Sequence, residues 1–430
     1  MSLKIAVIGA ASSYTPELFA NLIEQSGQLD VERVTLMDLN LEKLTFIAEV
    51  SKRLLTEANY PIEVVATQDR HQAIAEADFI ILQIRVAGLA ARARDEHLPM
   101  EFDMVGNETT GAGGFVCALR TVPIALEISR EVERLAPKAW LLNLSNPAGI
   151  ITEALLKHSH LHTVGFCNIP INTQYTLSKI LAVPPSKIRL DSFGLNHLSW
   201  VRGAYVDGQE LLQPLIAKAH TRRSALYQRG LVDSLIDPDW LQTIRLIPGW
   251  YLRYFYYPTQ VLEEDRRSLL SKGEQDMLAE EKIRQIYSTS GYNSAARQIL
   301  EAKGGAQYYL PVLQVIDSIA HDRGEVVVVD VRNGSTLPEL PPDVCVEVPA
   351  RIYREHIEPL PSGSMPLGVR GLVQAVKVYE ELTIESAITG NRRTAIEALV
   401  ANPLVGSYPK ARQFFDRVLE NEHTVLPQFF

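Results

Sequence analysis

Six short apolar segments alternate with helix-like segments over the first 170 residues, and this order narrows the possible folds more than any other feature of the chain. The segments read LKIAVI, VTLMD, IEVVA, FIILQI, AWLLNL and HTVGF. Their leucine and β-branched residues suit strands that are buried on both faces. Because segments with helical apolar spacing separate them, the order predicts a doubly wound parallel sheet.

The pattern changes after residue 168. The stretch IRLDSFGLNHLSWVRGAYVDG predicts a strand pair, and the rest is mostly helical, with strands near EVVVVDV and VCVEVPA. We therefore expect an α/β fold with a Rossmann-like domain over residues 1–170, followed by a mostly helical α+β domain over residues 171–430. We also expect a homo-oligomer, a dimer or a tetramer. The apolar helices of residues 371–422 fit its interface and fit a packed core equally well.

Composition excludes several classes of protein. At 430 residues and 46% hydrophobic, the chain lies far from the composition of disordered proteins. A net charge of −9 argues against nucleic acid as a partner. The apolar runs are shorter than the roughly 20 residues of a membrane span, and no export signal precedes the first strand, so we expect a cytoplasmic protein without membrane contact. Three widely spaced cysteines argue against a disulfide framework and leave room for one functional thiolate.

The turn after the first predicted strand, VIGAASSYTPEL, opens a helix and is a candidate nucleotide site. Gly9 permits a tight turn, and the hydroxyls of Ser12 and Ser13 suit phosphate oxygens at a helix N-terminus. Asp38 ends the second predicted strand, where a carboxylate binds ribose hydroxyls and disfavours a 2′-phosphate. We favour NAD over the alternative, a simple strand-to-helix turn capped by Asp38.

Two polar loops, NETTGAGG at 107–114 and NLSNPAG at 143–149, adjoin strands of the predicted parallel sheet. Ligands collect at the carboxyl ends of such strands. Glu108, Asn143 and Asn146 are therefore candidates to face the same crevice as Cys167, which ends the sixth predicted strand.

Cys167 and His197 are too few to close a structural zinc site, which takes four ligands. They suffice for an open site that a substrate completes. A buried free cysteine and a core histidine are the alternative, and spacing alone favours it. Arg85, Arg92 and Arg94 lie in a segment that reads as an exposed helix, although one of them could bind a substrate phosphate through two N–H groups.

Eight motifs together resemble one enzyme family. They are IGAASSYTPEL, IRVAGLAARARDE, GNETTGAGGFVCALR, NLSNPAG, CNIP, GLNHL, PGWYLRYFY and NPLVGSYPKA. In this order they are similar to the NAD- and metal-dependent glycoside hydrolase family four, over essentially the whole chain. The family is an exception to two-carboxylate glycoside hydrolysis. Asn168 after Cys167 resembles the 6-phospho-β-glucosidases, whereas the phospho-α-glucosidases have Asp there.

The resemblance implies roles for individual residues. Cys167 and His197 would hold Mn²⁺ or another divalent metal, which the sugar's 2- and 3-hydroxyls and water complete. Tyr251 would be the base, and Asn168 would orient or polarise the leaving group or a metal-bound hydroxyl. The substrate, a phosphorylated β-glucoside, would contact Asn146 and Glu108 through its sugar and Arg92 and Lys272 through its phosphate; NAD would lie on Gly9, Ser12, Ser13, Asp38 and Asn143.

Two departures from the family pattern stand out. The turn is Gly-Ala-Ala-Ser instead of Gly-Gly-Gly-Ser, and Lys272 replaces a second phosphate-binding arginine. A lysine keeps the charge but lacks the planar fork that binds two oxygens at once.

The implied reaction is hydrolysis to glucose 6-phosphate and an aglycone. Transient oxidation of C3 by NAD would acidify the C2 proton, a base would remove it, and the aglycone would leave from C1 by elimination. Alternatives within the family are another phosphoglycosidase or an α-glycosidase. Outside it, a lactate/malate-type dehydrogenase of 2-hydroxy acids or a non-catalytic NAD-binding sensor would share the first domain.

Overall fold

The computed structural model of the protein describes residues 2–25, 27–305 and 307–430. In these residues nine strands form one sheet, in the order β13-β12-β11-β6-β5-β4-β1-β2-β3. The strands β1 to β6 are neighbours in this order and pair in parallel, which confirms the predicted doubly wound sheet. The strand bounds are β1 Leu3–Ile8, β2 Val31–Met37, β3 Glu63–Thr67, β4 Phe79–Leu82, β5 Trp140–Asn143, β6 His162–Gly165, β11 Glu325–Arg332, β12 Cys345–Ile352 and β13 Ile357–Pro359.

Strands β11, β12 and β13 come from the second half of the chain but extend the first sheet. β11 joins antiparallel to β6, with Asp330 opposite Gly165, and β12 pairs along the whole of β11. The sequence assigned these strands to the second domain, and the structure places them in the same sheet as β1 to β6. The extension covers the edge of β6, which would otherwise expose unpaired backbone groups.

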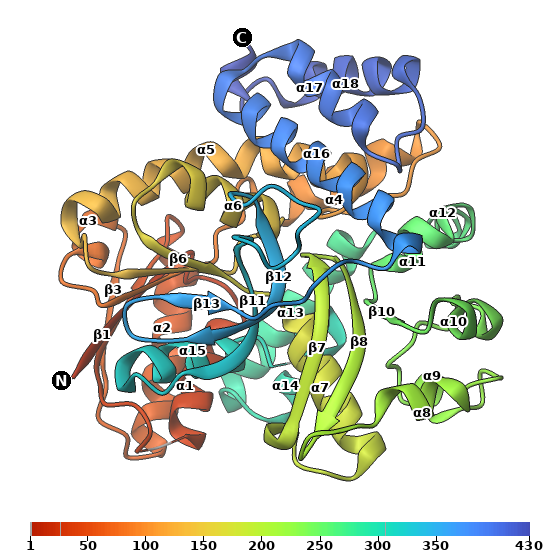
Figure 1. Cartoon of the computed structure of the whole chain (residues 1–430). Helices are drawn as coiled ribbons and strands as arrows, with labels where there is room; N and C mark the ends of the chain where they lie inside the picture. Colours follow the sequence, from red (N-terminus) through yellow and green to blue (C-terminus); the bar gives the residue numbers. More distant parts are fainter. Residues whose placement is uncertain (1, 26, 306) are drawn as a thin grey trace.

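A smaller sheet carries the predicted strand pair. Its strands are β7 Ile188–Leu195, β8 Leu198–Val206, β9 Gln209–Glu210 and β10 Ile247–Pro248. β7 and β8 are antiparallel and are joined by Asn196 and His197 alone. His197 has a φ of 62°, in the left-handed region, which is uncommon for a residue with a side chain. The β7–β8 hairpin runs down the centre of the molecule in Figure 1.

Helices cover both faces of the large sheet, with α3, α5 and α6 on one face and α1, α2 and α15 on the other (Figure 1). Helix bounds for the parallel-sheet part are α1 Thr15–Glu24, α2 Leu41–Glu57, α3 Arg70–Ile74, α4 Gly88–Met100, α5 Gly111–Leu135, α6 Ala148–His158 and α7 Asn168–Leu181. The remaining helices are η1 Pro185–Lys187, α8 Leu212–Ala217, α9 Ala225–Gln228, α10 Pro238–Ile244, α11 Leu252–Tyr256, α12 Pro258–Arg267, α13 Lys272–Ser290, α14 Ser294–Leu300, η2 Glu301–Gly305, α15 Leu310–His321, α16 Leu367–Thr389, α17 Arg392–Ala401, α18 Tyr408–Glu422 and η3 Pro427–Phe429.

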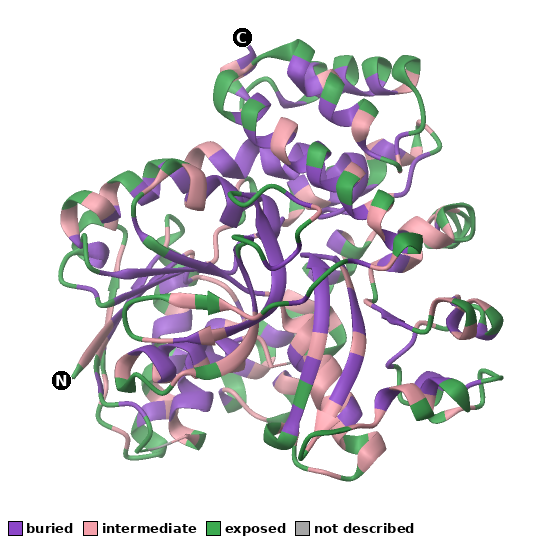
Figure 2. Ribbon diagram, in the orientation of Figure 1, coloured by how far each residue is buried: buried purple, intermediate pink, exposed green. Residues whose placement is uncertain are grey.

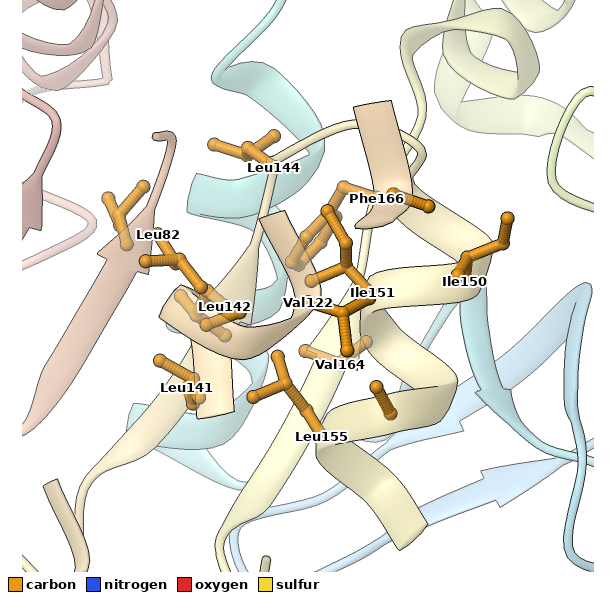
Figure 3. Packing of buried hydrophobic residues seen from close by; sticks show 14 of the residues in the cluster. Leu82, Val122, Leu141, Leu142, Leu144, Ile150, Ile151, Leu155, Val164 and Phe166 are labelled. Atoms are coloured by element: carbon orange, nitrogen blue, oxygen red, sulfur yellow. The ribbon is translucent and has the colours of Figure 1, made fainter. Parts of the chain in front are cut away.

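The main hydrophobic core lies between the sheet and these helices. Leu142 on β5, Val164 on β6, Val122 on α5 and Leu155 on α6 are fully buried and pack together (Figure 3). Figure 2 shows the central strands buried and the outer helix faces exposed. This two-sided burial explains why the strand sequences are continuous apolar runs instead of alternating ones.

Helix α5 begins at Gly111, inside the segment 107–114 that the sequence assigned to a loop, so only the first part of that segment is a loop. Within the described residues, α5 is the one helix long and apolar enough to cross a membrane. Its most apolar stretch is 83% buried inside the protein, as expected of a core helix.

The C-terminal helices α16, α17 and α18 belong to the same core. Val373 on α16 and Phe414 on α18 are fully buried, and Phe415 packs its ring edge against Phe115 of α5 at 6.0 Å between centroids. Their apolar spacing is therefore that of a packed core, one of the two interpretations that the sequence left open.

Gly9 ends β1 in a conformation that other residues rarely adopt. Its φ is 91°, and a Cβ there would lie 2.6 Å from the Gln83 carbonyl oxygen. Gly9→Ala is expected to lower the free energy of unfolding by about 1–3 kcal/mol, because it combines backbone strain with this clash. Urea denaturation checks this value, with Gly208→Ala as a control in which a positive φ meets no neighbouring atom within 4 Å. Equal losses in the two variants would exclude the clash as a cause.

Candidate active site

A cavity of about 1360 Å³ lies where the carboxyl end of the parallel sheet meets β7, β8 and the helices that follow them. It brings together most of the residues predicted from the sequence, which are distant along the chain. The predicted residues that line it are Gly9, Ser12, Asp38, Arg92, Glu108, Asn146, Cys167, Asn168, His197, Tyr251 and Lys272.

Ser13 and Asn143, two of the predicted NAD contacts, do not line this cavity. The Ser13 hydroxyl is buried and donates to the Glu280 carboxylate at 2.7 Å. The Asn143 side chain is fully buried and holds the following loop, accepting from the Ser145 N–H at 3.0 Å and donating to the Thr152 hydroxyl at 3.0 Å. Both side chains already have protein partners, so the structure gives them local structural roles.

The glycine turn and Asp38 occupy one end of the cavity. The Asp38 carboxylate accepts from the backbone N–H of Ala11 at 3.0 Å and from that of Asn40 at 3.0 Å. It therefore ties the end of β2 to the turn after β1. Asn40 and Lys43 line the cavity beside it.

Arg92 is surrounded by three carboxylates. Its Nε donates to Glu96 at 2.8 Å, and its Nη1 lies 2.7 Å from Asp276 and 3.1 Å from Glu108. Burial alone would raise the pKa of the Glu108 carboxyl, but the guanidinium groups of Arg85 and Arg92 outweigh burial and lower it. The sequence suggested a free guanidinium for a phosphate; in the structure two nitrogens of Arg92 are committed to protein carboxylates.

Lys272 provides a more accessible positive charge than Arg92. Lys272 begins α13, and its side chain is 42% exposed, with Nζ 3.3 Å from Asp276. Lys303 also lines the cavity, where its ammonium group contacts Glu280 and lies 4.9 Å from the centre of the Tyr14 ring. The sequence analysis did not single out Lys303.

Cys167 is the N-cap of α7 and lies two residues after the end of β6. Its sulfur accepts from the Ile169 backbone N–H at 3.4 Å. Burial raises the pKa of the thiol well above its usual range, and the nearby Glu347 carboxylate adds to this effect. The neighbouring Asn168 amide donates to the Gly304 carbonyl oxygen and so links α7 to the segment that carries Lys303.

His197 and Tyr251 form a stacked pair on the cavity wall. Their ring centroids are 3.8 Å apart and the ring planes differ by 13°. Burial lowers the pKa of His197 to about 3, so its imidazole is neutral at neutral pH. Burial also raises the pKa of the Tyr251 phenol, and Cys167 adds to that effect.

These residues fit an open metal site. The Nδ1 atom of His197 is buried and has no hydrogen-bond partner among the described residues, and a neutral imidazole is the form that binds metals. Cys167 lines the same cavity and offers sulfur. Within the described residues no three His, Cys, Asp or Glu side chains gather as a complete metal site, so a substrate or water would have to supply further ligands.

Glu347 and Trp250 are further cavity residues that were not predicted from the sequence. Glu347 on β12 lines the cavity although it is only 2% exposed, and burial raises its pKa to about 7. The signal was a charged residue inside the apolar strand VCVEVPA. Trp250 is 46% exposed at the cavity wall, beside Tyr251, and its pattern carried no separate signal.

Comparison with known proteins matches most of the chain to one enzyme family. The model for the family 4 glycosyl hydrolases matches residues 4–183, and the model for the C-terminal domain of these enzymes matches residues 192–405. A Bacillus subtilis protein named "Probable 6-phospho-beta-glucosidase" is 36% identical over 100% of this chain and 98% of its own. A phospho-α-glucosidase of Clostridium acetobutylicum is 26% identical over 97% of each chain.

Solved structures extend the likeness to three dimensions. The 6-phospho-β-glucosidase of Thermotoga maritima, crystallised with manganese, NAD⁺ and glucose 6-phosphate, superposes with a TM-score of 0.90 at 28% identity and covers 98% of this chain and 99% of its own. A lactate dehydrogenase from a deep-sea metagenome library shares only the fold, with a TM-score of 0.55 at 13% identity over 90% of this chain and 99% of its own. The motif order, the cavity and both family models lead to one conclusion: the chain belongs to glycoside hydrolase family four.

Proposed function

We propose that this family four phospho-glycosidase hydrolyses 6-phospho-β-glucosides to glucose 6-phosphate and an aglycone, with NAD⁺ and Mn²⁺ or another divalent metal as cofactors. The observation that carries the proposal is the stacked pair of His197 and Tyr251 in the same cavity as Cys167 and the glycine turn. A dehydrogenase of 2-hydroxy acids would have no need for the cysteine in this arrangement.

When bound, NAD⁺ would accept the C3 hydride and return it, and a divalent cation held by Cys167 and His197 would polarise the C3 oxygen. The other steps fall to the chain. Tyr251 would accept the proton from C2 and so allow the aglycone to leave from C1; water would then add to C1 while C2 takes up a proton again. Burial raises the pKa of the Tyr251 phenol, whereas the positive charge of Arg92 lowers it and so favours the phenolate that this step needs.

The cavity also offers groups for the rest of the substrate. Lys272 is the phosphate contact with the most accessible charge, and Arg92 would add its remaining N–H groups. Glu108 and Asn146 line the wall, where a carboxylate and an amide suit sugar hydroxyls. Glucose 6-phosphate in the Thermotoga maritima complex supports a phosphorylated sugar as the ligand.

The β-configuration rests on Asn168 and on the relatives. An amide has no proton to give at neutral pH, so Asn168 would orient or polarise the leaving group or a hydroxyl of the site. Of the relatives reported above, the protein named as a probable 6-phospho-β-glucosidase is 36% identical to this chain and the phospho-α-glucosidase is 26% identical.

The proposal assigns NAD binding to residues 1–170 and substrate binding with catalysis to residues 171–430, in a cytoplasmic homo-oligomer, a dimer or a tetramer. The two family models, which divide between residues 183 and 192, support a boundary in this region. The strands β11 to β13 nevertheless belong to the first sheet.

An assay with paired substrates tests the function. Chromogenic β-glucoside 6-phosphate should be hydrolysed, whereas its α-anomer and its unphosphorylated form should not, and omission of NAD⁺ or Mn²⁺ should abolish turnover. Hydrolysis of the α-anomer alone would overturn the β assignment. Net accumulation of NADH from a hydroxy acid would overturn the hydrolase itself.

A further inference from the structure

Glu347 is a buried carboxylate that the reaction outlined above does not use. It comes from β12, in the large sheet, but its side chain reaches the small sheet beside the cavity. Oε2 accepts from the Asn196 amide at 3.2 Å, and Oε1 accepts from the Ser199 hydroxyl at 2.7 Å. The two donors lie on either side of His197 along the chain.

The position of these donors matters because the turn they hold is only two residues long. His197 adopts a positive φ there, which costs free energy for a residue with a side chain. A buried carboxyl group that bonds Asn196 in the turn and Ser199 in β8 favours this one conformation, and with it the direction of the imidazole.

Both donors connect Glu347 to further parts of the site. The Asn196 side-chain oxygen accepts from the Gly149 backbone N–H at 3.3 Å, next to the loop that carries Asn146. The Ser199 carbonyl oxygen accepts from the Gly249 backbone N–H at 2.9 Å, in the loop that carries Tyr251. Through two side chains, Glu347 therefore contacts the hairpin and, one bond further, two other loops of the cavity.

We infer that Glu347 is a positioning residue, which fixes the β7–β8 turn so that His197 is held ready to bind a divalent metal. The inference rests on the proposed function, because it takes His197 as a ligand. It also explains why a carboxylate occupies a buried strand position whose neighbours are apolar. Residues that hold a metal ligand in this way typically change metal affinity about 10- to 100-fold when they are replaced.

Matched substitutions test the inference. Glu347→Met keeps the approximate shape but removes both acceptors, and it should weaken Mn²⁺ binding by about 10- to 100-fold. Glu347→Gln can still accept from Asn196 and donate to the Ser199 hydroxyl, so it should restore affinity to within about threefold of the unmodified protein. Asp330→Leu is the control: Asp330 faces Glu347 across β11 and β12 and is equally buried, but its oxygens have no hydrogen-bond partner among the described residues.

Three measurements on the purified full-length protein separate the outcomes. Electron paramagnetic resonance titration gives Mn²⁺ affinity, the thiolate-to-Co²⁺ charge-transfer band reports Cys167 ligation, and NAD⁺ titration and the melting temperature report general damage. Weaker Mn²⁺ binding in Glu347→Met alone, with NAD⁺ affinity retained, supports the inference. Equal Mn²⁺ affinity in all variants, or an equal loss in Glu347→Gln or in Asp330→Leu, overturns it. Absence of Mn²⁺ binding to the unmodified protein would instead contradict the proposed function.

Discussion

Replacing Tyr251 with phenylalanine is expected to lower kcat on a 6-phospho-β-glucoside by about 10²- to 10⁴-fold, the range typical of general acid–base catalysis. The substitution removes one oxygen and keeps the ring that stacks on His197 at 3.8 Å. Affinity for NAD⁺ and for Mn²⁺ should therefore change little. Steady-state kinetics with a chromogenic substrate, together with titration of both cofactors, provide the measurement.

Tyr256→Phe is the matched control for this experiment. Tyr256 is the last residue of α11 and lies five residues after Tyr251. Its hydroxyl accepts from the Trp200 indole N–H at 3.2 Å, and neither residue lines the cavity. Its loss should alter stability slightly and leave kcat near that of the unmodified protein. A Tyr251→Phe variant with the kcat of this control would assign the base to another group.

Cys167→Ser is expected to reduce activity by about 10³-fold or more at low Mn²⁺ concentration. The physical reason is that a serine hydroxyl stays protonated and uncharged, whereas a thiolate brings a negative charge to a divalent cation. Polarisation by a metal supplies several kcal/mol to a reaction of this kind. The Mn²⁺ concentration that gives half-maximal activity should become much higher. His197→Ala should give a similar shift, since it removes the other predicted ligand.

Cys345→Ser provides the control for the thiol. Cys345 is the first residue of β12 and is buried, with 2% of its surface exposed. It does not line the cavity. Its replacement should leave the metal dependence unchanged. Unchanged metal dependence in Cys167→Ser as well would remove the thiolate from the proposed site.

Much of the fold could be predicted because its signals are local. Each parallel strand is a short apolar run between helical segments, and burial on both faces imposes that composition on β1 to β6. The pairing of β11 with β6 could not be predicted in this way. It joins Asp330 to Gly165, which are far apart in sequence, and no periodicity in either segment carries that information.

The candidate site shows the same division. Turn chemistry and motif order identified Gly9, Cys167, His197 and Tyr251, all of which the fold brings to one cavity. The partners of the side chains could not be predicted from the sequence. Arg92 was predicted to bind a phosphate, and in the structure it contacts three carboxylates. Ser13 was predicted to bind NAD, and its hydroxyl donates to Glu280. Such contacts depend on which side chains meet in space.

Glu347 illustrates what the three-dimensional arrangement adds. In the sequence it is one charged residue in an apolar strand, whereas in the structure its two oxygens accept from Asn196, just before His197, and from Ser199, two residues after it. A histidine in a strained turn and a carboxylate from another sheet became one unit only through folding.

Deuterium incorporation tests the proposed reaction most directly. The unmodified protein, supplied with NAD⁺ and Mn²⁺, would hydrolyse an aryl β-glucoside 6-phosphate in deuterated water, and mass spectrometry and NMR would locate deuterium in the glucose 6-phosphate formed at early times. Removal of the C2 proton by Tyr251 predicts solvent deuterium at C2 of the product. Product that keeps its original hydrogen at C2 would contradict elimination at this site.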